Sequence, residues 1–138
     1  MAEVLHALLY VSKSMLAVPE EVGQVRDIIT ISHARNPGLG ITGALVFTQL
    51  HFAQLLEGPA GSLERLMASI RADPRHRDIE IVFDEPADER RFGSWSMAWC
   101  GSSFFFSQLI QPLSGRDPNA KLGVEAGRLI RAMQQYAG

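Results

Sequence analysis

Four polar side chains occupy positions where the pattern of the sequence predicts a buried apolar face. Gln54 lies between two large apolar residues on one face of the strand expected at 52–56, because strand side chains alternate with period two. Tyr10 lies in an apolar run, and Ser32 and Asn36 continue the apolar face of a helix. Burying an amide without a partner costs roughly 1–3 kcal/mol. For any one of these residues a self-satisfied polar network is the better interpretation, but the four together favour a planar polar ligand.

Other familiar site chemistries find no support in the sequence. The run 38–43 reads G-x-G-x-x-G, but it follows a helix and precedes a strand, the reverse of the order a dinucleotide site requires. The four histidines form no H-x-x-x-H or Cys-His cluster, so we expect no metal site. Cys100 has no histidine near it in sequence and no G-x-S-x-G elbow is present. We therefore do not expect an enzyme.

Composition limits the class of protein. The chain has 138 residues, 46% of them hydrophobic and 20% charged, which suits one folded domain and excludes intrinsic disorder. A net charge of -2 does not favour nucleic-acid binding. No apolar stretch approaches the roughly 18 residues of a membrane span, and the N-terminus lacks the features of a secretion signal. The single cysteine suits a reducing compartment, so we expect a soluble cytoplasmic protein.

The elements that must position the polar cluster alternate in type along the first 100 residues. Periodicity predicts a helix that opens at Pro19 and ends at the run 36–38, and a second helix with Ser62 as its N-cap that ends at 73–74. Strands are expected at 4–11, 44–47, 52–56, 79–83 and 94–100. The order β-α-β-β-α-β-β predicts an α+β fold of the ferredoxin-like kind, a mixed sheet with both helices on one face.

The C-terminal segment, 101–138, differs in kind from residues 1–100. We expect a connection bounded by proline and then one helix, whose apolar face is formed by Leu122, Ala126, Leu129, Met133 and Tyr136. This helix either covers the bare face of the sheet, which we favour, or contacts a partner. The phenylalanines at 104–106 either form an exposed patch or pack under the helix, and we favour packing.

A series of different short motifs runs along the first 100 residues, with 18 residues from Asn36 to Gln54 and 41 from Gln54 to Trp95. The motifs are L-L-Y-V-S at 8–12, Asn36 with G-I-T-G-A-L at 40–45, F-A-Q-L-L-E-G-P at 52–59, D-P-R-H-R-D at 73–78, E-P at 85–86, R-F at 91–92 and W-S-M at 95–97. Together they resemble the BLUF family of blue-light sensors using FAD, over most of residues 4–100.

The resemblance implies a role for each residue of the cluster. Tyr10 would give an electron and a proton to an excited flavin, and Gln54 would be the amide that switches its hydrogen bonds. Trp95 and Met97 match the positions thought to carry the signal into the fifth strand. The remaining residues would hold or line the site of a non-covalently bound FAD; they are Ser32, Arg35, Asn36, Asp73, Arg75 and His76.

The resemblance also implies a function, and alternatives remain. A BLUF-like photoreceptor of the short stand-alone type, with nothing catalytic after residue 100, would signal through a downstream protein or through self-association as a homo-oligomer. A light-inert module of the same fold, binding a flavin or a partner, is the main alternative. A small flavin-dependent oxidoreductase is the weakest, because no second substrate motif is present. A flavin photosensor based on a reactive cysteine is set aside, since Cys100 has no such motif.

Overall fold

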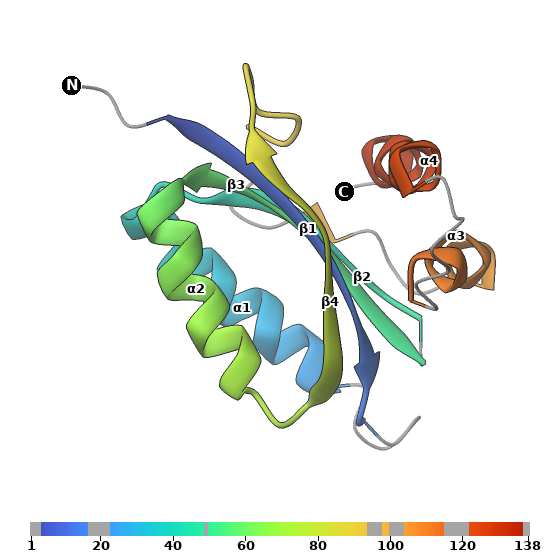
Figure 1. The fold of residues 1–138 in the computed structure, drawn as a ribbon. Coiled ribbons are helices and arrows are strands. Elements are labelled where there is room, and N and C mark those ends of the chain that lie inside the picture. Colours follow the sequence, from blue (N-terminus) through green and yellow to red (C-terminus); the bar gives the residue numbers. More distant parts are fainter. Residues whose placement is uncertain are drawn as a thin grey trace.

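The computed structural model describes residues 4–16, 23–48, 50–93, 98–99, 104–114 and 122–136. Within them a central sheet lies between two layers of helices (Figure 1). The elements in chain order are β1 (Leu5–Ser14), α1 (Gly23–Leu39), β2 (Thr42–Phe47), β3 (His51–Pro59), α2 (Ala60–Ala72), β4 (His76–Pro86), β5 (Ala98–Trp99), α3 (Phe104–Ser114) and α4 (Leu122–Tyr136).

The sheet has the strand order β4-β1-β3-β2-β5. The first four strands pair antiparallel, and β5 pairs parallel to β2 at the edge. This is the ferredoxin-like α+β arrangement with a mixed sheet, so the predicted fold class is confirmed. The register places Tyr10 of β1 directly opposite Gln54 of β3, the central strand pair of the sheet.

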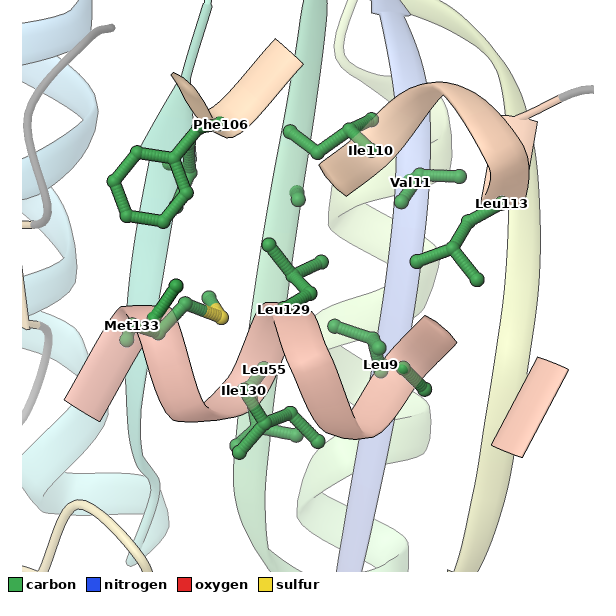
Figure 2. Packing of buried hydrophobic residues seen from close by; sticks show 14 of the residues in the cluster. Leu9, Val11, Leu55, Phe106, Ile110, Leu113, Leu129, Ile130 and Met133 are labelled. Atoms are coloured by element: carbon green, nitrogen blue, oxygen red, sulfur yellow. The ribbon is translucent and has the colours of Figure 1, made fainter. Parts of the chain in front are cut away.

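Each face of the sheet carries its own hydrophobic core. The side chains of Leu8, Tyr10 and Leu56 pack toward α1 and α2, whereas the alternate residues Leu9 and Leu55 pack toward α3 and α4. Figure 2 shows the second core, in which Leu9, Val11 and Leu55 of the sheet meet Phe106, Ile110 and Leu113 of α3 and Leu129, Ile130 and Met133 of α4. Because period-two alternation assigns each residue to one face, the sheet separates the polar cluster from the C-terminal helices.

Helix α1 runs through Pro37 and ends at Leu39, so the expected stop at 36–38 is wrong. The carbonyl of Asn36 accepts from the N–H of Ile41 at 3.0 Å, and that of Pro37 accepts from the N–H of Gly40 at 3.2 Å. With Gly40 at φ +69°, these two bonds form a Schellman motif. Proline so close to a helix end removes one backbone bond and leaves the rest of the helix intact.

Other boundaries differ by a few residues. Helix α2 starts at Ala60 with Pro59 as its N-cap, so Ser62 is not the cap. It ends at Ala72 with Asp73 as its C-cap, as predicted. Strands β1, β3 and β4 are longer than expected because their flanking residues extend the pairing. Of the strand predicted at 94–100, the structure describes Ala98–Trp99.

Two helices, rather than one, are described in the C-terminal segment. The connection expected before the last helix contains α3, whose buried residues Phe106, Ile110 and Leu113 follow helical spacing. Helix α4 covers the sheet face, which confirms the favoured interpretation. Phe106 packs in this core and Phe105 is half exposed, so packing of the phenylalanine run is confirmed for one of them.

Candidate functional site

Tyr10 and Gln54 form a hydrogen-bonded pair on the sheet beneath α1 and α2. The Tyr10 hydroxyl donates to Gln54 Oε1 at 2.5 Å, and the two residues are 3% and 4% exposed. Their positions opposite one another on β1 and β3 make the contact a direct consequence of strand register. The predicted convergence of a buried tyrosine and a buried glutamine is therefore present in the fold.

A cavity opens over this pair, between the two helices and the sheet. The space in it that the centres of water molecules can occupy is about 70 Å³. Tyr10 and Gln54 lie in its wall. The other lining residues are Ile28, Ile31, Ser32 and Arg35 from α1, Leu45 and Phe52 from the sheet, Ser69 and Ile70 from α2, and Asp73, Arg75 and His76 from the connection to β4 and its start.

Burial fixes the protonation state of Tyr10. Removal from water raises the pKa of its phenol far above the ordinary value, the charge of Asp73 raises it further, and Arg35 partly opposes both. Desolvation lowers the pKa of the Arg35 guanidinium, and the nearby Tyr10 opposes this shift. Tyr10 consequently keeps its proton at any ordinary pH and presents a hydroxyl donor to Gln54.

Asp73 and Arg75 form a two-pronged ion pair at the mouth of the cavity. Arg75 Nη2 donates to Asp73 Oδ2 at 2.6 Å, and Arg75 Nε donates to Oδ1 at 2.9 Å. These hydrogen bonds lower the pKa of the Asp73 carboxyl and raise that of Arg75. The pair shapes the short connection after α2 and holds one charge of each sign beside the cavity.

His76 ties β1 to the end of α2. Its Nε2 lies 2.6 Å from the backbone carbonyl oxygen of Ile70, and its Nδ1 lies 2.7 Å from Ser12 Oγ. Since a carbonyl can only accept, Nε2 carries a proton, and in the neutral ring Nδ1 accepts from the Ser12 hydroxyl. The ring also contacts those of Tyr10 and Phe52 edge-on. His76 thus closes one side of the cavity next to Tyr10.

The donor and acceptor set fits a planar ring with polar edges. Isoleucine, leucine and phenylalanine side chains provide apolar walls, while Gln54 and Ser32 offer hydrogen bonds within the cavity and Arg35 offers a cation. A flavin ring has this combination of apolar faces and edge carbonyls and nitrogens, so the residues present fit it.

Comparison with known proteins agrees with this geometry. The family model described as "Sensors of blue-light using FAD" matches residues 5–98. The chain belongs to the BLUF family. BLUF domains bind a flavin and act as sensors of blue light, and such a domain is not itself catalytic.

Curated relatives share the BLUF region of much longer proteins. Photoactivated adenylate cyclase subunit alpha of Euglena gracilis is 41% identical over 87 residues, which is 63% of this chain and 8% of that protein. Blue light- and temperature-regulated antirepressor BluF of Escherichia coli (strain K12) is 35% identical over 85 residues, 62% of this chain and 21% of that protein. The chain therefore spans about a fifth or less of the length of these two relatives.

Solved BLUF structures match along nearly the whole chain. BlrB, described as a BLUF protein in its dark state, is 34% identical with a TM-score of 0.79 over 98% of both chains. The BLUF domain of BlrP1 is 27% identical with a TM-score of 0.67, over 96% of this chain and 90% of the other. The agreement with BlrB extends through the C-terminal helices as well as the BLUF core.

The BLUF cavity gathers seven of the eight residues predicted to hold or line a cofactor site; they are Tyr10, Ser32, Arg35, Gln54, Asp73, Arg75 and His76. Asn36 is fully buried beside it, and its side-chain Oδ1 accepts from Arg35 Nε at 3.3 Å. Trp95 and Met97 lie outside the described residues.

Sequence reasoning missed several lining residues of the BLUF cavity. Ile28 and Ile31 form a helical stripe with Ser32 and Arg35 at spacings of three and four, and Ser69 and Ile70 do the same toward Asp73. This spacing was present in the sequence.

The described residues contain neither a candidate membrane span nor a candidate metal site. None of the helices among them combines the length and hydropathy needed to cross a membrane. Within the same part of this BLUF chain, no group of three or more histidine, cysteine, aspartate or glutamate side chains is arranged to hold a metal ion.

Proposed function

We propose that the protein is a blue-light photoreceptor that binds FAD non-covalently in the cavity between α1 and α2. The observation that carries the proposal is the hydrogen bond from Tyr10 to Gln54 in the wall of that cavity. It joins a residue that can yield an electron and a proton to a residue whose two ends can exchange hydrogen-bond roles. FAD is proposed because the description of the family names it.

The residues proposed to hold the flavin divide by chemistry. Ile28, Leu45, Phe52 and Ile70 would pack against the ring faces. The polar groups proposed to bond its edges or flank its mouth are Ser32, Arg35, Asn36, Gln54, Asp73, Arg75 and His76. A cavity that is polar at a few points and apolar elsewhere binds a ring in one orientation without a covalent link.

Tyr10 is the proposed electron and proton donor. A bound flavin excited by blue light is a strong oxidant, and this is the chemistry the cofactor supplies. Because its raised pKa keeps Tyr10 protonated, the phenol must release its proton when it loses an electron. The proton at Tyr10 Oη already faces an acceptor, Gln54 Oε1, at 2.5 Å.

Gln54 is the proposed switch. In the structure its Oε1 faces the Tyr10 hydroxyl, so the amide accepts from that hydroxyl. Turning the amide over, or moving a proton onto its oxygen, would present a donor where an acceptor now lies. The hydrogen bonds in the cavity would change while no charged group is buried and no net covalent bond is made.

The output of the sensor is proposed to pass through its C-terminal segment. We infer that Trp95 and Met97 link the cavity to 101–138, and that this segment docks a downstream protein or a second copy of the chain. The division of the chain at residue 100 into sensor and C-terminal parts belongs to the same proposal. Support comes from relatives whose names couple light to an adenylate cyclase or an antirepressor. A cytoplasmic location is part of the proposal as well.

Absorption spectra before and after blue light test the function. The wild-type protein is expected to purify yellow, release its flavin on acid precipitation, and show a small red shift that reverses in the dark. Gln54→Leu is expected to keep the flavin and lose the red shift, because leucine has similar size but neither donor nor acceptor. Gln134→Leu, the same change at an exposed site on α4, should behave as wild type.

The results separate three cases. Protein that cannot be reconstituted with flavin contradicts the proposal as a whole. Bound flavin with no light-driven shift in the wild type identifies a light-inert binding module of the same fold. A normal shift in Gln54→Leu removes glutamine from the mechanism.

A further inference from the structure

Glu57 is a fully buried carboxyl group on the opposite face of the strand that carries Gln54. The two residues are three positions apart on β3, an odd spacing, so strand alternation directs Gln54 toward α1 and α2 and Glu57 toward the other side of the sheet. Glu57 is 0% exposed and shares its face with Ala53 and Leu55. A carboxyl group among apolar neighbours needs fixed hydrogen-bond donors to remain buried.

Those donors come mainly from the loop between β4 and β5. The N–H of Phe92 donates to Glu57 Oε1 at 3.0 Å, and the N–H of Arg91 donates to Oε2 at 2.5 Å. The hydroxyl of Thr42, on β2, adds a donor to Oε1 at 3.1 Å. Both carboxyl oxygens therefore act as acceptors, and two of the three donors are backbone groups of a single loop.

Arg90 extends this network to the end of α1. Its Nη1 donates to Thr42 Oγ1 at 2.9 Å and to the backbone carbonyl of Glu57 at 3.1 Å. Its Nη2 donates to the carbonyl oxygen of Gly40 at 2.8 Å, at the residue whose positive φ ends the helix. Loop 90–92 is thus bonded to the end of a cavity helix and to the strand of the switch residue.

Phe92 of the same loop is also buried in the core under α3 and α4. Phe92 is 1% exposed and belongs to the cluster formed with α3 and α4. The same cluster includes Phe106 of α3 and Met133 of α4. One short loop consequently makes fixed bonds to β3 and α1 and packs its phenylalanine with the C-terminal helices.

We propose that Glu57 is the positioning residue that carries a change at Gln54 across the sheet to α3 and α4, by holding loop 90–92 to β3. The proposal rests on the proposed light-driven switch at Gln54. Separating a buried carboxylate from its donors is costly, so the loop follows any shift of β3 at Glu57. Because Phe92 of this loop is buried in the same core as residues of α3 and α4, the docking of these helices then depends on the position of β3.

Glu57→Gln disrupts the pair of hydrogen bonds from the backbone of loop 90–92 with little change in the shape of the side chain. The amide of glutamine has one acceptor and one donor end, whereas Oε1 and Oε2 of Glu57 each face a backbone N–H. In either orientation one N–H of the loop meets another donor. Glu89→Gln is the matched control, because it makes the same change of charge at an exposed position in the same loop.

The experiment compares hydrogen exchange of residues 104–136 in the dark and under continuous blue light, with the flavin spectrum recorded on the same samples. Wild type and Glu89→Gln are expected to show a red shift and a light-dependent change in exchange. Glu57→Gln is expected to keep the red shift, since Gln54 and the cavity lie on the other face, but to lose at least half of the change in exchange. Thr42→Val, which removes one donor to Glu57 and leaves the two loop donors, is expected to lose a smaller part.

The outcomes distinguish this inference from the proposed function. A red shift that is missing in the wild type refutes the photoreceptor itself. If the wild-type red shift is present but exchange in 104–136 is the same in the dark and in light, the inference is wrong and the photoreceptor stands. A full change in Glu57→Gln also overturns it, and if that variant does not fold, an undiminished change in Thr42→Val does the same.

Discussion

The phenol of Tyr10 is defined by its burial and by its neutral hydrogen-bond partner. It is almost completely buried, which raises its pKa, yet it is hydrogen-bonded to an amide rather than to a charged group. A carboxylate in the place of Gln54 would accept the proton more strongly but would itself have to be buried as a charge. In the neutral pair Tyr10 therefore keeps its proton without the burial of a charge, and it would release this proton only when it loses an electron.

Tyr10→Phe is expected to leave the fold and the bound flavin intact and to abolish the reversible red shift. Phenylalanine fills the same space in the cavity wall but has no proton to release and gives up an electron far less readily. Light-minus-dark absorption spectra are the measurement. A variant that cycles like wild type would make another aromatic residue the donor, and Trp95 would be the first to substitute.

The same variant tests the raised pKa of Tyr10 through stability. Its folded-state pKa lies above the unfolded value of 10.0, so this stabilising contribution is complete below pH 10.0 and declines as the pH rises further. One proton changes the free energy of unfolding by at most about 1.4 kcal/mol per pH unit. Urea unfolding between pH 9 and 11.5 should show a steeper decline for wild type than for Tyr10→Phe, and equal slopes would contradict the burial of the phenol.

At the scale of elements, the features that the sequence predicted correctly depend on residues close together in the chain. Period-two alternation correctly placed Tyr10 and Gln54 on one face, and helical spacing placed Ser32 and Asn36 against it. The end of α1 was misjudged because proline and glycine at 37–38 resemble a stop. The bonds that decide the end, from Gly40 and Ile41 back to the last turn, depend on the backbone conformation of Gly40.

Contacts between distant segments were the part that the sequence could not supply. The bonds between Glu57 and loop 90–92 join residues 33 to 35 positions apart, and nothing in the spacing of Arg90 predicts a bond to the end of α1. Glu57 could nonetheless have been noticed in the sequence, because it is a lone acidic residue on the same strand face as Ala53 and Leu55. Helix α3 could also have been noticed, since Phe106, Ile110 and Leu113 are spaced by four and three.

Two glycines give a sharp test of element packing. In Gly43→Ala the new methyl group would lie 2.0 Å from the backbone oxygen of Leu55, so the paired strands β2 and β3 must separate. The loss of stability should reach several kcal/mol. Gly61→Ala, in the first turn of α2, meets nothing within 4 Å and should stabilise by up to about 1 kcal/mol.

Urea unfolding followed by circular dichroism measures both glycine variants. A tolerated Gly43→Ala would show that the contact of β2 with β3 is looser than this register implies. A destabilised Gly61→Ala would show that α2 does not begin at Ala60.

At the scale of the whole molecule, one sheet supports two cores with different tasks. The core under α1 and α2 includes the polar pair and the cavity, whereas the core under α3 and α4, with Leu129 at 0% exposure, is apolar apart from the buried Glu57 at its edge. The first is kept open for a ligand, so the second, closely packed core must contribute a large share of the stability. Changes on the C-terminal side should therefore act on stability before they act on the cavity.

Leu129→Ala is expected to cost about 2–5 kcal/mol, because it removes a fully buried side chain between α4 and the sheet. Hydrogen exchange should show lost protection in α4, while the colour of the bound flavin is retained at moderate temperature. Val124→Ala, at a half-exposed position on the same helix, should lie within about 0.5 kcal/mol of wild type. A small effect of Leu129→Ala would mean that α4 rests only loosely on the sheet.

The central place of β1 also decides the order in which the protein can be assembled on the ribosome. Both neighbours of this first strand come later in the chain, β3 ending at Pro59 and β4 at Pro86. At about 5–20 residues per second, synthesis from the end of β1 to the end of β4 takes about 4–15 s. During that time the apolar run 7–11, buried in the finished sheet, has at most one of its two neighbours. The nascent chain thus exposes a ready substrate for chaperones, and slower translation at lower temperature prolongs that exposure while weakening the hydrophobic attraction that would drive aggregation.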